Sequence, residues 1–173
     1  MVVIVVGCDH DVQSKHHADD PRIESDRRYF RDTVADLIHR YAVKYIGEEA
    51  AWDCVTATQG LAQEHSVRYS RIDIPKEAQL QINVRPYPGD SARISEYWLA
   101  WQLVREWHMY KTFCAHLEGA QSTMVVCGRY HAPGIINLLT TDLGAEVLGL
   151  CLRVTHSIEF HDCCERSKNA LPY

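Results

Sequence analysis

Short apolar runs alternate along this chain with longer segments whose apolar residues recur at helical spacing. The apolar runs occupy residues 2–6, 43–46, 124–127 and 147–154, and a less regular run occupies 67–74. Runs of this length that are rich in β-branched residues predict buried strands. The run at 67–74 alternates imperfectly, so we expect it toward an edge of the sheet.

The segments between these runs predict helices. In residues 23–41 the apolar side chains fall on one face, and further helices are expected over 52–64, over 93–118 and from Pro133 to about Asp142. Strands that alternate with helices predict an α/β fold, with a mainly parallel central sheet and helices on both faces. We expect a single domain over residues 1–173, with a core of about 1–154 and a C-terminal extension of about 155–173.

Two connecting segments are unusual in composition. Residues 8–22 form a polar stretch rich in His and Asp, directly after the first strand, and predict a long loop. Residues 76–92 contain two prolines and a glycine and predict a connection or lid. Long loops at the carboxyl ends of strands frequently carry function.

The helix expected at 93–118 has aromatic residues on two faces. One regular stripe contains Ala100, Leu103, Trp107, Tyr110, Cys114 and Leu117, and a second face contains Trp98, Trp101, Arg105 and His108. One face should contact the sheet. The other is expected to contact the site or a partner subunit, so this helix is the candidate surface for a homo-oligomer.

Composition narrows the function classes. The 173 residues are 46% hydrophobic and 24% charged, which is typical of a soluble globular protein. The net charge of −5 argues against nonspecific binding to nucleic acid. No apolar run approaches a membrane span, and the first run is too short for a signal peptide. With seven scattered cysteines and no Cys-x-x-Cys, we expect a protein of the bacterial cytoplasm rather than a disulfide framework.

Histidines follow two of the predicted strands in the same pattern. Gly7-Cys8-Asp9-His10 ends the first strand, and Gly128-Arg129-Tyr130-His131 ends the strand at 124–127. Glu48 and Glu49 follow a third strand, where adjacent side chains should point to opposite sides. Because ligands bind at the carboxyl ends of parallel strands, these residues are candidates for one shared site.

This set of motifs resembles the superfamily of TraB and PrgY pheromone-shutdown proteins, Tiki proteases, erythromycin esterases and ChaN-like haem-binding proteins. The run Val-Val-Cys-Gly-Arg-Tyr-His-Ala-Pro-Gly-Ile, at residues 125–135, is similar to the TraB-type second motif. Arg105, followed by Glu106, lies in a place resembling that of the family's arginine. The resemblance covers most of residues 1–150 and implies either hydrolysis of a small molecule or peptide, or ligand binding.

For the hydrolytic interpretation, His10, His131 and one of Glu48 and Glu49 would hold a water or a divalent metal such as Mn, Zn, Co or Fe. Arg105 would stabilise developing negative charge. Asp73, at the end of the strand at 67–74, is a further candidate ligand. The full metal-ligand hypothesis is therefore His10, Glu48, Asp73 and His131.

Each of these residues also has an ordinary structural explanation, such as a backbone hydrogen bond, a helix cap or a solvated ion pair. The alternative function is a non-catalytic protein, either a haem or small-ligand carrier or a regulatory interaction module. A catalyst requires the polar residues to converge on one point, whereas a binding module does not. Weaker candidates are a Cys8 or Cys127 nucleophile and metal patches at 16–20 or 161–164.

Overall fold

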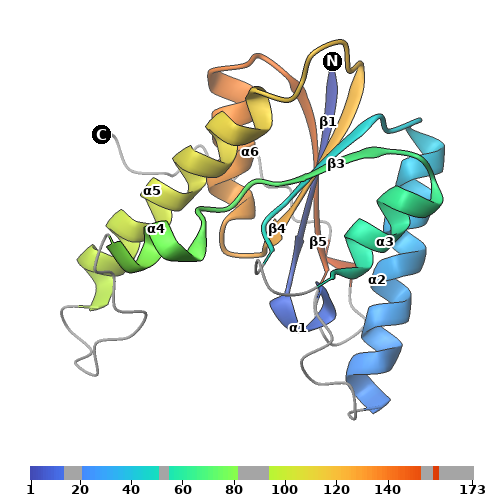
Figure 1. Ribbon diagram of the computed structural model, residues 1–173, viewed down its shortest axis with the longest axis horizontal. Helices are drawn as coiled ribbons and strands as arrows, with labels where there is room; N and C mark the ends of the chain where they lie inside the picture. The colour runs from blue at the N-terminus through green and yellow to red at the C-terminus, as the bar shows by residue number, and fades with distance from the viewer. Residues whose placement is uncertain (14–20, 51–54, 82–93, 153–157, 160–173) are drawn as a thin grey trace.

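The computed structural model describes residues 1–13, 21–50, 55–81, 94–152 and 158–159 (Figure 1). The strands are β1 (Val2–Cys8), β2 (Tyr45–Glu48), β3 (Arg68–Arg71), β4 (Ser122–Gly128), β5 (Glu146–Leu152) and β6 (Ile158–Glu159). The helices are α1 (His10–Gln13), α2 (Pro21–Arg40), α3 (Ala57–Glu64), α4 (Lys76–Gln81), α5 (Ile94–Cys114) and α6 (Ala132–Thr141).

The strands form one sheet in the order β3-β2-β4-β1-β5-β6. The first five are parallel, and only the two-residue β6 pairs in the antiparallel sense. The predicted α/β fold with a mainly parallel sheet is therefore confirmed, as is the edge position of β3 among the parallel strands. Among the described helices, none is both long and apolar enough to cross a membrane.

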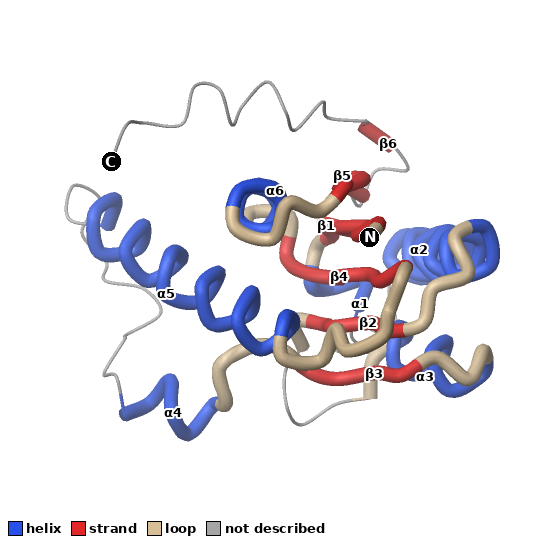
Figure 2. The backbone as a smooth tube through the Cα atoms, turned by 90° about the horizontal axis from the view of Figure 1, so that it is seen from above, coloured by secondary structure: helices blue, strands red, loops and turns tan. Residues whose placement is uncertain are grey.

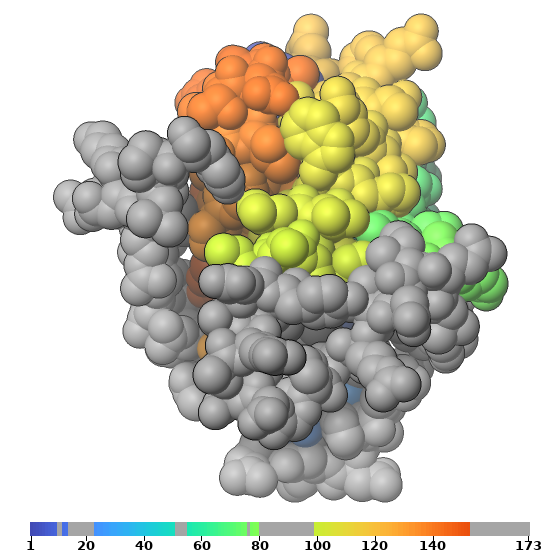
Figure 3. All heavy atoms as spheres, turned by 90° about the vertical axis from the view of Figure 1, so that its left-hand side faces the viewer, coloured from blue at the N-terminus to red at the C-terminus, as the bar shows by residue number. Residues whose placement is uncertain are grey.

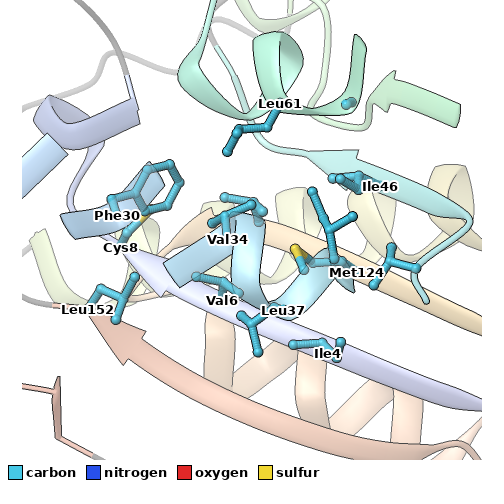
Figure 4. Close-up of a cluster of buried hydrophobic side chains, with 14 of the residues drawn as sticks. Ile4, Val6, Cys8, Phe30, Val34, Leu37, Ile46, Leu61, Met124 and Leu152 are labelled. Atoms are coloured by element: carbon cyan, nitrogen blue, oxygen red, sulfur yellow. The ribbon is translucent and has the colours of Figure 1, made fainter. Parts of the chain in front are cut away.

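Helices cover both faces of the sheet, because the apolar side chains of the central strands alternate between two cores (Figure 2). Ile4 and Val6 of β1 face α2 and α3, where they pack with Phe30, Val34 and Leu61 (Figure 4). Val3 and Val5 face α5 and α6. A central strand that is apolar at every position satisfies both cores at once.

Several predicted boundaries were wrong. The segment 8–22 is not all loop, because α1 occupies 10–13 and α2 begins at Pro21. Helix α3 begins at 57, where the hydroxyl of Thr56 caps it, five residues after the predicted start. Residues 76–81 form α4, because Lys-Glu-Ala-Gln-Leu-Gln is a run of good helix formers. The rest of the predicted lid lies outside the described residues.

The structure shows which face of α5 is buried, a point that the sequence left open. Among residues 99–114 the buried side chains are Gln102, Glu106, Met109, Tyr110 and Phe113. The first part of the predicted apolar stripe is exposed instead, with Leu103 at 38% and Trp107 at 46% exposure. Helix α5 lies beside α6 on the face of the molecule that Figure 3 shows. A polar pair, Gln102 and Glu106, therefore forms part of the buried face of α5.

Candidate functional site

The two Gly-x-x-His motifs lie side by side at the carboxyl edge of the sheet. Strands β1 and β4 are adjacent and parallel, with Gly7 opposite Cys127 and Cys8 opposite Gly128. The backbone N–H of Arg129 donates to the carbonyl of Cys8 at 3.0 Å, and Arg129 forms an ion pair with Asp9. After β1 the chain continues to α2 on one face of the sheet, and after β4 it continues to α6 on the other. Such a change of direction is where open α/β sheets bind ligands.

Glu49 projects into this edge from the end of β2. Its side chain is 1% exposed. Oε2 accepts the backbone N–H of Gly128 at 2.7 Å, and Oε1 accepts Nη2 of Arg105 at 2.5 Å. Strand β2 lies beside β4, so the strand order brings Glu49 next to the second motif across 79 residues of sequence.

Arg105 of α5 connects Glu49 to Asp73, which follows β3. The guanidinium donates to both carboxylate oxygens of Asp73, from Nε to Oδ1 at 3.1 Å and from Nη2 to Oδ2 at 2.6 Å. Burial lowers the pKa of Arg105, but the hydrogen bonds and charges of Asp73 and Glu49 outweigh it and the pKa is raised. The arginine is therefore a fixed positive charge held by two carboxylates.

His131 is the N-cap residue of α6, which begins at Ala132, one residue before the predicted start, and its side chain is 5% exposed. Nδ1 lies 3.2 Å from Oε1 of Glu106, within hydrogen-bond distance. Nε2 lies 3.5 Å from Oε1 of Glu49, which is an ion-pair separation rather than a hydrogen bond. The imidazole therefore sits between two buried carboxylates, and a neutral ring that donates from Nδ1 keeps Nε2 free to accept a proton.

Glu106 is the member of this cluster that the sequence analysis did not assign to the site. Its carboxylate rests on the first turn of α6, where a Cβ on residue 134 would overlap it. Gly134 therefore makes room for Glu106, and a glycine so close to a helix start was a usable signal.

Glu48 belongs to a different environment from Glu49. Its carboxylate lies on the side of α3, where Oε2 accepts hydrogen bonds from Thr56 at 2.5 Å and Tyr69 at 2.7 Å. Burial raises the pKa of Glu48, and the hydrogen bonds from Thr56 and Tyr69 only partly oppose this. The structure thus brings Glu49, Asp73, Arg105 and His131 together and leaves Glu48 apart.

The remaining sequence candidates fall into two groups. The backbone of His10 begins α1 at the same edge, while its side chain and the patches at 16–20 and 161–164 lie outside the described residues. Cys8 and Cys127 are fully buried, and burial raises both pKa values well above the ordinary thiol value. Neither thiol is suited to nucleophilic attack.

The described donors do not make a metal site. Among the residues that the structure describes, no three His, Cys, Asp or Glu side chains are grouped so that they could hold an ion. Both carboxylates of the Arg105 bridge are already committed to the guanidinium. The described cluster itself offers carboxylate, imidazole and guanidinium groups.

Comparisons of the chain with protein-family models, with curated proteins and with solved structures find no match.

Proposed function

We propose that this protein is a hydrolase whose reaction centre is the cluster of Glu49, Asp73, Arg105, Glu106 and His131. The observation that carries the proposal is the convergence of three carboxylates, a guanidinium and an imidazole from four separate segments, with Arg105 and Glu106 both on α5. Burying so many ionisable groups is costly even when they are paired, and ordinary core residues would fill the space more stably. Such clusters at the carboxyl edge of a sheet are typical of catalytic sites.

In this proposal His131 is the general base. Nδ1–H donates to Glu106, which holds the ring so that the lone pair of Nε2 can accept a proton from water. The water oxygen then forms a bond to the substrate carbonyl carbon, and the carbonyl π electrons move to its oxygen. Arg105, held by Glu49 and Asp73, stabilises that oxyanion. Collapse of the intermediate breaks the bond to the leaving group, which takes the proton from His131.

Arg105 marks the side from which substrate would enter. Its side chain is 19% exposed, more than those of Glu49, Asp73, Glu106 and His131. A carbonyl approaching the guanidinium from this side meets the positive charge first. The motif resemblance supports the reaction type, with an ester, lactone or peptide as the substrate class.

A metal-dependent form of the proposal requires a donor beyond Glu49 and His131, and the sequence offers His10 for that position. Elemental analysis of the purified protein beside a His10→Ala variant tests this form. About one Mn, Zn, Co or Fe per wild-type chain, lost in the variant, would support a metal ion bound through His10. An equal metal content in the two proteins would contradict this metal-dependent form.

The hydrolytic proposal is tested by screening esters, lactones and peptides with the wild type and a His131→Gln variant. Loss of a general base typically lowers the rate 10²- to 10⁴-fold. His116→Gln is the matched control, because His116 lies exposed on the turn after α5, where Nδ1 bonds to the Thr112 carbonyl and the ring stacks on Tyr45, away from the cluster. A folded wild type that hydrolyses none of the three classes, or a His131→Gln variant of equal activity, would contradict the proposal.

A second candidate function follows from the exposed side of α5. Leu99, Leu103, Val104 and Trp107 each expose between 38% and 52% of their surface. An apolar stripe of this kind favours contact with another protein, and a second copy of the chain is the partner we propose. Sedimentation of the wild type beside Leu103→Lys tests it, since a dimer should dissociate in the variant.

A further inference from the structure

A pocket of about 700 Å³ lies on the opposite face of the sheet from the Arg105 cluster. It opens between α1, the first half of α2 and the start of α3, which gather at one end of the molecule (Figure 1). Pockets of this size accommodate a metabolite-sized ligand. Its described lining includes Arg27, Arg28 and Arg31 of α2 and the apolar side chains of Val12 and Val55.

Three arginines from consecutive turns of α2 line this pocket. Arg27 is buried, with its side chain 10% exposed and 3.9 Å from Glu24. Arg31 pairs with Glu64, outside the pocket, at 3.2 Å. Among the described residues, no carboxylate pairs with Arg28. Glu24 and Asp32 also line the pocket, so three positive charges face two negative ones and the lining favours an anion.

The start of α3 forms the wall that faces these arginines. Thr56 caps the helix by accepting the N–H of Gln59 at 3.1 Å. The preceding amides, of Ala57 and Thr58, have no acceptor within the helix, since the first-turn N–H groups of any helix lack one. The helix dipole adds partial positive charge at the same place. Guanidinium groups on one wall and helix amides on the other are a complementary pair for a phosphate.

We propose that this pocket binds a small molecule that carries a phosphate group. The phosphate would lie between Arg28, Arg31 and the first turn of α3, and the apolar side chains of Val12 and Val55 would contact the body of the ligand. Bidentate contacts from arginine suit the tetrahedral oxygens of phosphate. The site is separate from the proposed hydrolytic centre, because α2 and α3 pack on one face of the sheet and α5 and α6 on the other.

The test is an NMR titration of the ¹⁵N-labelled full chain with inorganic pyrophosphate and, separately, with citrate. Binding at the pocket should shift the amides of Ala57, Thr58 and Gly60 and leave those of Gly128 and His131 in place. Pyrophosphate should bind more tightly than citrate. Shifts at Gly128 and His131 instead, or tighter binding of citrate, would overturn the phosphate pocket, as would the absence of saturable shifts.

Arginine variants distinguish specific binding at the pocket from nonspecific charge attraction. An Arg28→Gln/Arg31→Gln double variant should weaken pyrophosphate binding at least tenfold. Arg40→Gln is the control, because Arg40 lies on the same helix, outside the pocket, paired with Asp36 at 2.7 Å. Both variants change exposed side chains, so circular dichroism should match the wild type. Equal weakening in the two variants would mean nonspecific charge attraction and would contradict the proposal.

Discussion

Glu48 and Glu49 are neighbours in sequence, yet their carboxylates lie on opposite faces of the sheet. The carboxylate of Glu49 meets Arg105 of α5, and that of Glu48 meets Thr56 and Tyr69 on the side of α3. The cause is the two-residue period of an extended chain, which continues one residue past the end of β2. Two identical side chains therefore have different partners, and substitutions at the two positions should have different effects.

Glu49→Ala is expected to destabilise the fold by about 2–4 kcal/mol. The change leaves the N–H of Gly128 without its carboxylate acceptor and leaves Arg105 with Asp73 alone. Urea unfolding measures the loss. Glu64→Ala, which breaks only an exposed pair with Arg31, should cost less than about 1 kcal/mol. Similar losses in the two variants would argue against a buried cluster at Glu49.

Glu48→Gln is expected to change how stability depends on pH. Because burial raises the pKa of Glu48 above 4.5, the folded chain holds this proton to a higher pH than the unfolded chain. The stabilisation from this proton is fully present below the unfolded pKa and is lost as pH rises through the folded pKa. Each unit of pKa difference corresponds to about 1.4 kcal/mol.

The glutamine variant stays neutral, so its stability relative to wild type should increase from pH 4.5 toward neutral pH. Urea unfolding across this range measures the difference. Glu64→Gln is the matched control, because it makes the same chemical change at an exposed side chain. A difference between Glu48→Gln and wild type that is constant with pH would mean that Glu48 ionises equally in both states.

Gly134→Ala is expected to destabilise the fold by about 1–3 kcal/mol, because the new Cβ overlaps the carboxylate of Glu106. Gly60→Ala is the matched control. It also lies in a helix, but a Cβ there meets no atom within 4 Å. Because alanine has less conformational entropy than glycine in the unfolded chain, this variant should be more stable than wild type by about 0.5–1 kcal/mol. Thermal unfolding of the two variants measures the change in stability of each relative to wild type. A Gly134→Ala variant more stable than wild type would contradict the packing of Glu106 against residue 134.

The sequence did not predict β6, but it was sufficient to predict the five parallel strands, because a parallel sheet requires apolar runs that are readable without any partner. The same holds for the helix after β4, which ends as predicted before Gly144, where φ is 61°. The sequence pattern also predicted that Glu49, Asp73 and His131 lie at one edge of the sheet, since the carboxyl ends of parallel strands share that edge. The spacing of the motifs and the direction of the strands can both be predicted from short stretches of sequence.

The rest depends on contacts between distant segments. Glu106 is buried because it reaches the first turn of α6, and Gly134 permits that contact 28 residues later in the chain. The sequence of α5 offers two faces with aromatic residues, and in the structure Met109 and Phe113 are buried while Leu103 and Trp107 are exposed. A pattern within one helix cannot reveal which of its two apolar faces meets the sheet.

The contact between His131 and Glu106 predicts which ring nitrogen carries the proton. A neutral His131 should carry it on Nδ1, because that nitrogen lies 3.2 Å from Oε1 of Glu106. In Glu106→Leu this acceptor is gone, so the proton should move to Nε2, which faces Glu49 at 3.5 Å. Nitrogen-15 shifts of the imidazole at alkaline pH distinguish the two tautomers.

The tautomer change would have a specific effect on the proposed reaction. A protonated Nε2 cannot accept a proton from water, so kcat should fall in Glu106→Leu while circular dichroism stays as in the wild type. Glu106→Gln is the conservative comparison, because its amide oxygen can still accept from Nδ1 and should retain the wild-type tautomer. A wild-type ring protonated at Nε2 would contradict the role of Glu106 in orienting His131.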